Sequence, residues 1–588
     1  MPEPSATTAY CELDYPGQAP DERLRVAFED AELVLTAREA KEVPAVLRQV
    51  EAAAAAGRWV VGFVAYEAGP GLDPVLATRS PSDLPCASFA IFRDTAAAPR
   101  PRHEFLPGIW HDEATRQQFD VMVADIRRGI AAGDFYQVNA TTRLHAPLLG
   151  DALGFFDALK ASQPEALCAF LDFGRWQICS VSPEMFFDWK VVQGGSRSLT
   201  ARPMKGTAAR ARNPVADAAA ARQLHASPKE RAENLMIVDL IRNDLSRVAR
   251  LGTVTVPQLL SVEGWPTVWQ MTSTVRCETR DEVTLGDVFG ALFPCGSVTG
   301  APKRAAMTAI AKLEGSPRGV YCGAIGVVKP GGEALFSVGI RTVVVDAARG
   351  MAECGIGSGI TLDSNAPDEW AEWQAKQLFL KRACPEFELL ETLRLHGGRY
   401  WLKRGHLRRL ARSAAMLGFS LDAESIEAAL AAIAADRPTG QWRVRLLLLP
   451  TGAARAEAFA LEAMTDVAAV AVAASAVASS NPWLRHKTTR RGCYDALARN
   501  APGIFDTLLF NEHGEVTEFT RGNLVADIDG ERVTPPLACG VLPGVLREAL
   551  LSRGRLRERI IRRDDLSRAG ALWFINSVRG ALPVRLVG

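Results

Sequence analysis

The hydrophobic and polar positions divide the chain into helix-like and strand-like segments along its whole length. Residues 114–133 and 227–249 carry apolar side chains at helical spacing. Residues 58–69 and 335–346 are apolar runs of the kind that forms buried strands. No repeat with a period of about 20 to 50 residues is evident, so a solenoid is not expected.

Breaks in this pattern predict three parts. Strand-like runs with Pro- and Gly-rich turns occupy residues 1–110 and end in the loose stretch DTAAAPRPRHEF. Helices and strands interleave over residues 111–382, and a second domain of catalytic size fills residues 383–588. We expect an N-terminal subdomain, a large catalytic domain and a C-terminal enzyme domain, and the fold class is predicted to be α+β.

Composition and charge narrow the class of protein. Hydrophobic residues make up 48% of the chain, charged residues 23%, and the net charge is +1, so nothing favours nucleic acid as a partner. The first residues lack the features of a signal peptide, and no apolar run approaches the ~18 residues of a membrane helix. The eleven cysteines form no CxxC pair, which favours reduced thiols. We therefore expect a cytoplasmic protein that does not bind membranes.

Lysine is scarce in this chain. Only 12 of the 68 basic residues are lysine, and after residue 382 only Lys403 and Lys487 occur. A desolvated lysine can lose its proton and act as a nucleophile or form a Schiff base, whereas arginine cannot. Lys205 in RPMKGT and Lys487 in RHKTTRR are therefore candidates for chemistry. For Lys205, a loop lysine in water is the alternative interpretation.

Two pairs of glutamates share a helical spacing of three residues. Glu230 and Glu233 lie in SPKERAENLMIVDL, and Glu369 and Glu372 lie in DEWAEWQAK. In a helix each pair lies on one face, and such pairs are usually solvated. If the two pairs converged, however, they would suit a hard divalent cation, with Mg²⁺ the first choice.

Glycine-rich turns stand between these predicted helices. They are FPCGSVTGAPK at residues 293–303 and CGIGSGITLDS at residues 354–364. Glycine permits the main chain to approach a ligand closely, and a helix that opens at Pro302 would direct its amides at an anion. From the residues alone we infer a Mg²⁺-assisted enzyme that acts on a small carboxylate.

An ordered series of motifs resembles the chorismate-utilising enzymes. It comprises YQVNAT, SPEMFF, RPMKGT, ERAENLMIVDLIRNDL, FPCGSVTGAPK, YCGAIG, IRT and GIGSGITLDSNAPDEWAEWQAK. The resemblance implies a large two-layer α/β domain that binds chorismate and Mg²⁺. It also implies that Glu233 and Glu372 bind the metal, with Glu230 and Glu369 in support. The residues that it assigns to the substrate are Thr299, Gly300, Ala301, Tyr321, Arg341, Gly357, Ser358 and Gly359.

Two positions select the reaction within this family. Family members that add water to chorismate resemble one another in having a lysine base at the position of Gln137. The resemblance therefore disfavours hydration of chorismate by this chain. Lys205 is similar to the lysine in the PIKGT segment of aminodeoxychorismate synthases, where anthranilate synthases have PIAGT. The resemblance implies that Lys205 attacks carbon 2 of chorismate, that Glu184 protonates the departing hydroxyl at carbon 4, and that ammonia then enters there. As a departure from the family pattern, Gln270 stands where many relatives have a histidine.

The C-terminal part resembles the fold type IV pyridoxal phosphate enzymes, the branched-chain aminotransferase type that includes aminodeoxychorismate lyase. The resemblance implies that Lys487 forms the Schiff base with pyridoxal 5'-phosphate and that Glu518 pairs with the pyridine nitrogen. The residues that it assigns to the phosphate are Arg409, Val545, Leu546 and Ser577. The family's usual opening strand before FETLR is absent. Either the N-terminal half completes this domain, or the site is degraded.

Together the two resemblances imply consecutive steps. Chorismate is aminated to 4-amino-4-deoxychorismate, and loss of pyruvate then leaves 4-aminobenzoate for folate biosynthesis. No GxCxGxQ-type elbow occurs in the chain, so we expect ammonia from a separate glutaminase subunit. Two alternatives stay open: an anthranilate synthase fused to an aminotransferase, and a synthase with a non-catalytic C-terminal scaffold. A homodimer through the C-terminal domain also stays open.

Overall fold

The computed structural model divides into two compact units. It describes residues 9–17, 23–192, 194–211, 213–264, 268–384, 386–462, 464, 467–499 and 501–587. Unit 1 comprises residues 1–101, 111–145 and 155–384, and unit 2 comprises residues 102–110, 146–154 and 385–588. No helix within the described residues is long and apolar enough to cross a membrane.

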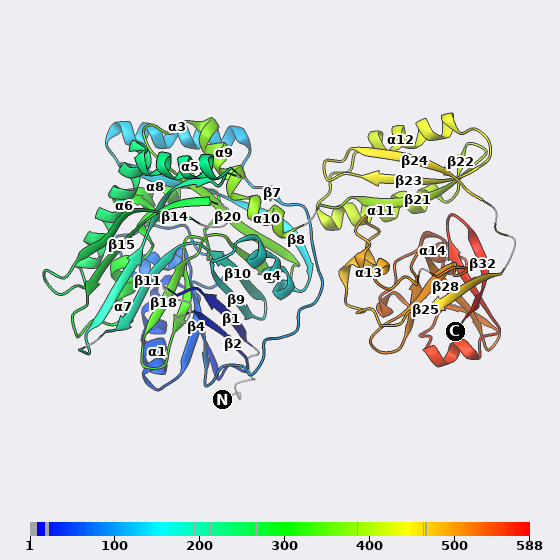
Figure 1. The fold of residues 1–588 in the computed structure, drawn as a ribbon, viewed down its shortest axis with the longest axis horizontal. Helices are drawn as coiled ribbons and strands as arrows, with labels where there is room; N and C mark the ends of the chain where they lie inside the picture. Colours follow the sequence, from blue (N-terminus) through cyan, green and yellow to red (C-terminus); the bar gives the residue numbers. More distant parts are fainter. Residues whose placement is uncertain are drawn as a thin grey trace. The chain divides into compact units, whose positions relative to one another are not determined.

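Two ten-stranded sheets form the body of unit 1 (Figure 1), although the strand Phe105–Pro107 and the last five residues of the strand Gln137–Gly150 belong to unit 2. The first contains, in spatial order, β16 (Gly300–Ala301), β8 (Gln137–Gly150), β20 (Met351–Ile360), β19 (Thr342–Asp346), β10 (Trp176–Ser182), β9 (Leu167–Phe173), β1 (Tyr10–Tyr15) and β2 (Leu24–Phe28), while β6 (Phe105–Pro107) and β7 (His111–Asp112) also pair with β8. The second contains β13 (Met204–Ala209), β15 (Val268–Glu278), β12 (Arg197–Arg202), β11 (Met185–Val191), β18 (Ala334–Val338), β17 (Ala324–Val328), β4 (Trp59–Val64), β5 (Ala87–Phe92) and β3 (Leu33–Ala37), with β14 (Thr255–Gly264) paired to β15.

The two sheets pack face to face because both present apolar side chains to a common core. Leu13 of β1 and Leu171 of β9 belong to the first sheet, and they share one buried cluster with Val61 of β4 and Ile325 of β17 from the second. Burial of such faces is the main favourable contribution to folding. Strands buried on both sides account for the continuous apolar runs in the sequence.

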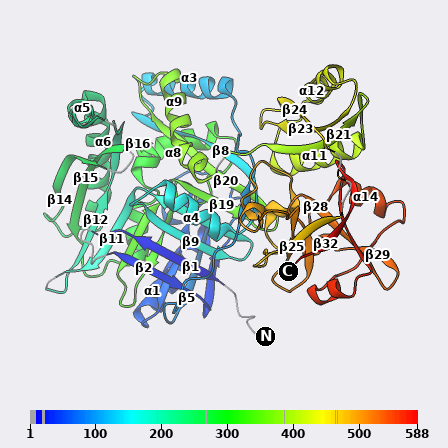
Figure 2. The same cartoon turned by 45° about the vertical axis from the view of Figure 1, so that its right-hand side comes forward.

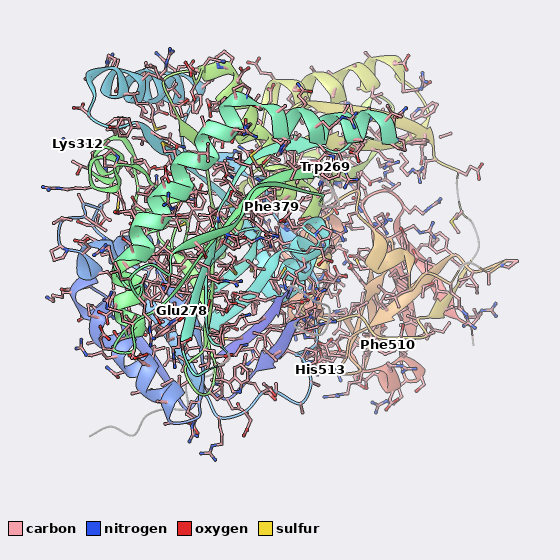
Figure 3. The ribbon with its side chains drawn as sticks, turned by 60° about the vertical axis from the view of Figure 1, so that its left-hand side comes forward. Trp269, Glu278, Lys312, Phe379, Phe510 and His513 are labelled. Atoms are coloured by element: carbon pink, nitrogen blue, oxygen red, sulfur yellow. The ribbon has the colours of Figure 1, made fainter. Side chains whose placement is uncertain are left out.

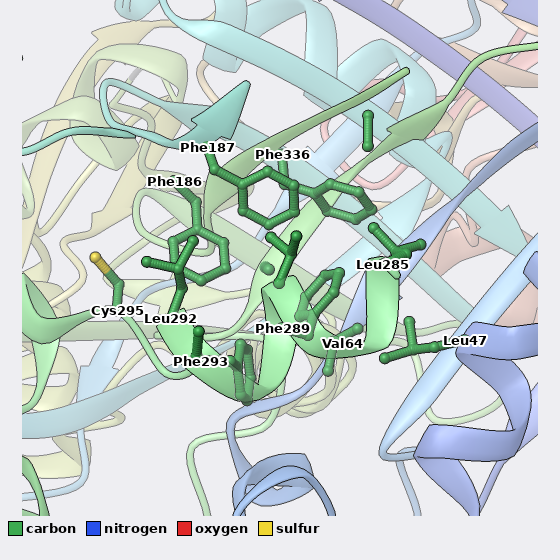
Figure 4. Packing of buried hydrophobic residues seen from close by; sticks show 14 of the residues in the cluster. Leu47, Val64, Phe186, Phe187, Leu285, Phe289, Leu292, Phe293, Cys295 and Phe336 are labelled. Carbon is green, nitrogen blue, oxygen red and sulfur yellow. The ribbon is translucent and has the colours of Figure 1, made fainter. Parts of the chain in front are cut away.

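Helices cover the other face of the second sheet. They are α1 (Val43–Ala55), α6 (Pro228–Ser246) and α7 (Leu285–Leu292), whose apolar residues join the strands in a second cluster. Phe289 of α7 packs edge to face against both Phe187 and Phe336, at centroid distances of 5.4 and 5.1 Å, and Figure 4 shows the three rings together. Such aromatic contacts stabilise a core beyond simple area burial. The packing fixes the helix α6 that carries Glu230 and Glu233.

The remaining helices of unit 1 lie around the sheets. They are α2 (Gly69–Leu72), α3 (Arg116–Ala132), α4 (Ala152–Ser162), α5 (Pro214–Ala226), α8 (Lys303–Leu313), α9 (Ala366–Lys376) and α10 (Leu378–Ala383). Figures 1 and 2 show α3 and α9 side by side. Phe119 of α3 meets Trp370 and Trp373 of α9 edge to face, at centroid distances of 5.1 and 4.5 Å. This contact orients the helix that carries Glu369 and Glu372.

Unit 2 contains two further sheets. A four-stranded sheet runs in the order β22 (Arg399–Tyr400), β21 (Leu389–His396), β23 (Gln441–Leu448), β24 (Ala454–Ala460), and it packs with α11 (Lys403–Leu417) and α12 (Ala423–Asp436). An eight-stranded sheet runs β27 (Val516–Phe519), β26 (Asp506–Phe510), β25 (Ala468–Val472), β32 (Gly580–Leu586), β31 (Ala571–Asn576), β28 (Gly522–Ile528), β29 (Glu531–Thr534), β30 (Arg557–Glu558). Two short helices, α13 (Gly492–Asp495) and α14 (Val545–Leu551), complete the unit. The predicted α+β class is confirmed.

Candidate active sites

Lys205 of β13 lies beside residues from two strands of the other sheet. A Cβ atom placed on Gly359 of β20 would lie 2.0 Å from Gln137 Nε2 and 3.3 Å from Lys205 Nζ. The absence of a side chain at Gly359 lets these two polar side chains approach the strand closely. Gln137 is only 1% exposed, and its Oε1 accepts no hydrogen bond within the described residues. This unpaired acceptor beside an amine marks a place for a polar ligand.

Glu184 is a buried carboxyl group near the same amine. It is 3% exposed, and burial raises its pKa to about 7, although a 2.7 Å hydrogen bond from Ser297 Oγ and the ammonium of Lys205 oppose the rise. Near pH 7 a large fraction of this group keeps its proton. A general acid that works at neutral pH requires this property.

The glutamates of α6 and α9 act on one another electrostatically. Burial raises the pKa of Glu230 and of Glu233, and the Glu372 carboxylate adds to both shifts while Lys229 and Lys205 oppose them. The carboxylates of the two helices are therefore close enough to influence one another through their charges. Oxygen donors of this kind are what Mg²⁺ prefers.

Two of these glutamates already have partners. Glu369 is buried and accepts hydrogen bonds from Ser358 Oγ at 2.6 Å and Ser364 Oγ at 2.7 Å. Burial raises the pKa of Glu372, but the Lys376 ammonium, 2.6 Å away, outweighs it, so the net shift is downward. Among the described residues, no three acidic, histidine or cysteine side chains are close enough together to hold a metal ion. The donors fit Mg²⁺ in type, and the four glutamates stay a prediction as its ligands.

The segment Thr299–Ala301 is held tightly against β8. Gly300 pairs with Val138, and its φ of +143° is accessible only to glycine. A Cβ atom there would lie 2.1 Å from the Gln137 carbonyl oxygen. Asn139 N also donates to the Thr299 carbonyl at 2.8 Å. These contacts bring the predicted substrate residues of this turn next to Gln137.

Lys376, which was not among the predicted site residues, holds Gly357 of β20 in place. Lys376 Nζ donates to the Gly357 carbonyl at 2.7 Å, and the Lys376 carbonyl accepts from Arg341 Nη1 at 2.8 Å. The guanidinium of Arg341 also lies 5.2 Å from the ring of Phe379, which Figure 3 labels. Burial lowers the pKa of Arg341. The ring of Tyr321 lies flat on the strand, since a Cβ on Gly355 would sit 2.1 Å from Tyr321 Cγ.

Gln270 supports the turn that follows Lys205. It lies near the start of β15, directly after Trp269, which is labelled in Figure 3. Its Nε2 donates to the Gly206 carbonyl at 2.8 Å, and its Oε1 accepts from Thr207 Oγ1 at 2.9 Å. Gln270, which stands where many relatives have a histidine, therefore holds the backbone of β13 in place.

Unit 2 contains a cavity of about 500 Å³ that collects the second group of predicted residues. Its lining includes Arg409, Lys487, Glu518, Val545, Leu546 and Ser577. Burial lowers the pKa of Lys487 to about 8, and the cations of Arg409 and Arg491 lower it further. A lysine in this state is neutral often enough at pH 7 to 8 to bond to a carbonyl carbon.

Glu518 is buried in the same cavity and accepts three hydrogen bonds. The donors are Tyr494 OH at 2.9 Å, Asn523 Nδ2 at 3.0 Å and Leu542 N at 3.1 Å. Burial raises the pKa of this carboxyl to about 8. A cationic ring nitrogen would favour the charged form, so this acid fits the predicted partner of a pyridinium.

Arg409 is fixed by a carboxylate that sequence reasoning missed. Its Nε and Nη2 donate to the two oxygens of Glu391 at 2.8 and 2.6 Å, and its Nη1 donates to the Pro543 carbonyl at 3.0 Å. Burial would raise the pKa of Glu391, but Arg409 and His406 lower it to about 2. Glu391 lies in the segment FELLETLR. That segment was recognised in the sequence, but nothing in it indicated that Glu391 would pair with Arg409.

Comparison with known proteins finds a different matching family for each half of the chain. Residues 95–382 match the family of chorismate binding enzymes, and residues 388–587 match the class IV aminotransferases. The first part of the chain is therefore similar to the chorismate binding enzymes, and the second part is similar to the class IV aminotransferases.

Individual relatives are similar over part of their length. Aminodeoxychorismate synthase component 1 of Salmonella typhimurium is 39% identical over 267 residues, which cover 45% of this chain and 57% of that protein. Anthranilate synthase component 1 of Streptomyces coelicolor is also 39% identical over 267 residues, covering 45% and 50%. The chain thus spans between half and three fifths of these relatives. The structure of anthranilate synthase component I from Streptococcus pneumoniae has the same fold (24% identity, TM-score 0.51, 65% of this chain and 93% of that one).

Proposed function

We propose that unit 1 aminates chorismate to 4-amino-4-deoxychorismate and that unit 2 removes pyruvate from this product, leaving 4-aminobenzoate for folate biosynthesis. The observation that supports the first step best is the amine of Lys205 beside Gly359 and Gln137. An anthranilate synthase has alanine at that position of its PIAGT segment, according to the family resemblance. A lysine amine therefore favours chemistry at carbon 4 of the substrate ring.

In the first step, the nitrogen lone pair of the Lys205 side chain forms a bond to carbon 2 of chorismate while the bond from carbon 4 to its hydroxyl breaks. Glu184 gives its proton to that hydroxyl, which leaves as water. Ammonia then bonds to carbon 4, and the amine of Lys205 leaves carbon 2 with the electron pair. Mg²⁺, held by Glu233 and Glu372 with Glu230 and Glu369 behind them, would offset the charge of a substrate carboxylate.

In the second step, the residues of the unit 2 cavity hold a cofactor and move a proton. Pyridoxal phosphate, when bound, supplies an electron sink for the carbon that loses a proton. Arg409, Val545, Leu546 and Ser577 would contact its phosphate, and Glu518 its ring nitrogen. Lys487, with its lowered pKa, takes the proton from carbon 4 of the substrate. The bond from carbon 3 to the enolpyruvyl oxygen then breaks, the ring becomes aromatic, and the released enolate takes up a proton to become pyruvate.

A separate glutaminase subunit is the proposed source of ammonia. The Salmonella relative is named component 1, which implies a second component for that protein. Pure chain should therefore form product with ammonium salts and not with glutamine alone.

One assay tests both steps. Purified chain receives chorismate, Mg²⁺ and ammonium, with and without pyridoxal phosphate, and pyruvate and 4-aminobenzoate are measured. We expect 4-aminobenzoate only with the cofactor, and 4-amino-4-deoxychorismate without it. The 39% identity to an anthranilate synthase component makes 2-aminobenzoate the competing product. Its appearance as the main product would overturn the proposal.

A further inference from the structure

Unit 2 is not built from the C-terminal part of the chain alone. Residues 102–110 and 146–154, which lie far earlier in the sequence, belong to it. β6 pairs there with the end of β8, with Leu106 opposite Leu149 and Phe105 opposite Gly150. We refer to these two segments as the N-terminal hairpin.

The N-terminal hairpin contributes to the hydrophobic core of the four-stranded sheet. Leu106 is fully buried in one cluster with Phe387, Leu389 and Leu417, and Ile109 and Leu149 pack against the same cluster. Removing such a side chain from a close-packed core leaves a cavity that the surroundings fill only in part. The core of unit 2 is therefore incomplete without the hairpin.

Hydrogen bonds and close backbone contacts tie the hairpin to α11 and to the segment before Lys487. Ile109 N donates to the Leu417 carbonyl at 2.8 Å, and Trp483 Nε1 donates to the Phe105 carbonyl at 2.8 Å. Gly150 has a φ of +88°, and a Cβ atom there would lie 3.0 Å from Pro482 Cγ. Gly150 thus has a left-handed backbone conformation, which favours glycine, at the point where the hairpin contacts Pro482.

Trp483 connects the hairpin to the cavity that holds Lys487. It lies in the short helix Pro482–Arg485, four residues before the lysine. Its indole meets Phe387 edge to face at 5.1 Å, and the guanidinium of Arg490 lies 4.6 Å from the same ring. Arg490 and Lys487 both line the cavity. One indole therefore touches the hairpin, the core and a cation of the site.

We propose that the N-terminal hairpin is a structural part of the class IV site and that Trp483 is the positioning residue through which it orients Lys487 and Arg490. The C-terminal part then lacks a fully formed site unless residues 102–110 and 146–154 of the first half are present. This proposal goes beyond the proposed reaction, because it holds for any substrate of the unit 2 cavity.

Cleavage of the intact protein tests the structural claim. A specific protease site is inserted between Cys384 and Glu386 of the full chain, the folded protein is cut, and the fragments are separated by gel filtration. We expect them to elute together. A C-terminal fragment that separates and still binds pyridoxal phosphate with unchanged affinity would overturn the proposal.

A matched pair of charge substitutions shows whether the hairpin causes this association. Leu106→Asp places a carboxylate in the core of unit 2, whereas Leu251→Asp makes the same change at a fully exposed leucine of unit 1. After cleavage, L106D should release the C-terminal fragment and L251D should not. Amination of chorismate with ammonium should continue in both. Retention of the fragment by L106D would contradict the assignment.

Two substitutions of the buried Trp483 test its positioning role, and W483F disturbs the core less than W483A. Trp483→Phe keeps an aromatic ring but leaves the Phe105 carbonyl without its donor, while Trp483→Ala removes the ring as well. We expect elimination to slow about tenfold in W483F and further in W483A. The pH profile for reductive methylation of Lys487 in the cofactor-free protein should shift in both, by less in W483F. If both variants keep the wild-type profile and rate, Trp483 has no positioning role.

Discussion

Replacing Glu184 with glutamine tests the proposed general acid most directly. Glutamine has the same size and can still accept the hydrogen bond from Ser297, but it has no proton to give. Because proton transfer by a positioned group contributes about 10²–10⁴-fold, the amination rate with ammonium should fall by at least about 10²-fold. Elimination from supplied 4-amino-4-deoxychorismate should be unchanged, since Glu184 belongs to unit 1.

The same substitution should change how stability depends on pH. Burial raises the pKa of Glu184 from 4.5 to about 7. Between these values the folded chain binds a proton that the unfolded chain has lost, so stability falls as pH rises through this window. At about 1.36 kcal/mol per pKa unit, the loss reaches about 3 kcal/mol by pH 8. The stability of E184Q relative to wild type should therefore increase by about 3 kcal/mol between pH 4.5 and pH 8.

Urea unfolding at several pH values, followed by tryptophan fluorescence, measures this difference. Glu67 provides a matched control, because burial also raises its pKa to about 7, while it binds the backbone at Arg318 and Gly319. E67Q should show the same trend with pH and keep the amination activity. A stability difference for E184Q that is constant with pH, or an amination rate within threefold of wild type, would refute the reasoning.

Three further substitutions address the other assigned groups. Lys205→Ala should abolish amination, with loss of at least about 10²-fold in 4-aminobenzoate by chromatography, while elimination from supplied intermediate continues. Lys487→Ala should remove the visible absorbance of bound pyridoxal phosphate and make 4-amino-4-deoxychorismate accumulate. Glu391→Gln should leave the buried Arg409 without its counter-charge and lower cofactor affinity and stability, by about 3–5 kcal/mol for a fully broken buried pair, as measured by cofactor titration and thermal unfolding. Unchanged values in any of these would remove the role assigned to that residue.

Local patterns were enough to predict much of the fold. Helical spacing indicated the segments that became α3 and α6, and the proline before Lys303 marked the start of α8. These elements follow from periodicity and capping, which depend on residues close together in the chain. The motifs likewise predicted the fold class, and the candidate residues that they indicated in unit 2 line one cavity, while the roles of these residues stay predictions.

The pKa values and ion pairs of the candidate sites depend on tertiary packing, which could not be predicted from the sequence. The pKa of Glu184 follows from burial and from Ser297, 113 residues away. The pairing of Glu391 with Arg409 arises because α11 packs on β21. Nothing in the stretch DTAAAPRPRHEF indicated that its last four residues and the five that follow would belong to unit 2. Contacts of this kind depend on burial and geometry, and a list of residue types contains neither.

The uninterrupted length of strand β8 makes it sensitive to deletions. Its 14 residues run without interruption from Gln137 to Gly150. Because side chains alternate between the two faces of a strand, losing one residue in the middle would turn every later side chain to the opposite face. A single-codon deletion there would break the match with either β16 at one end or β6 at the other. We therefore expect natural insertions and deletions to avoid this strand and to gather in surface turns.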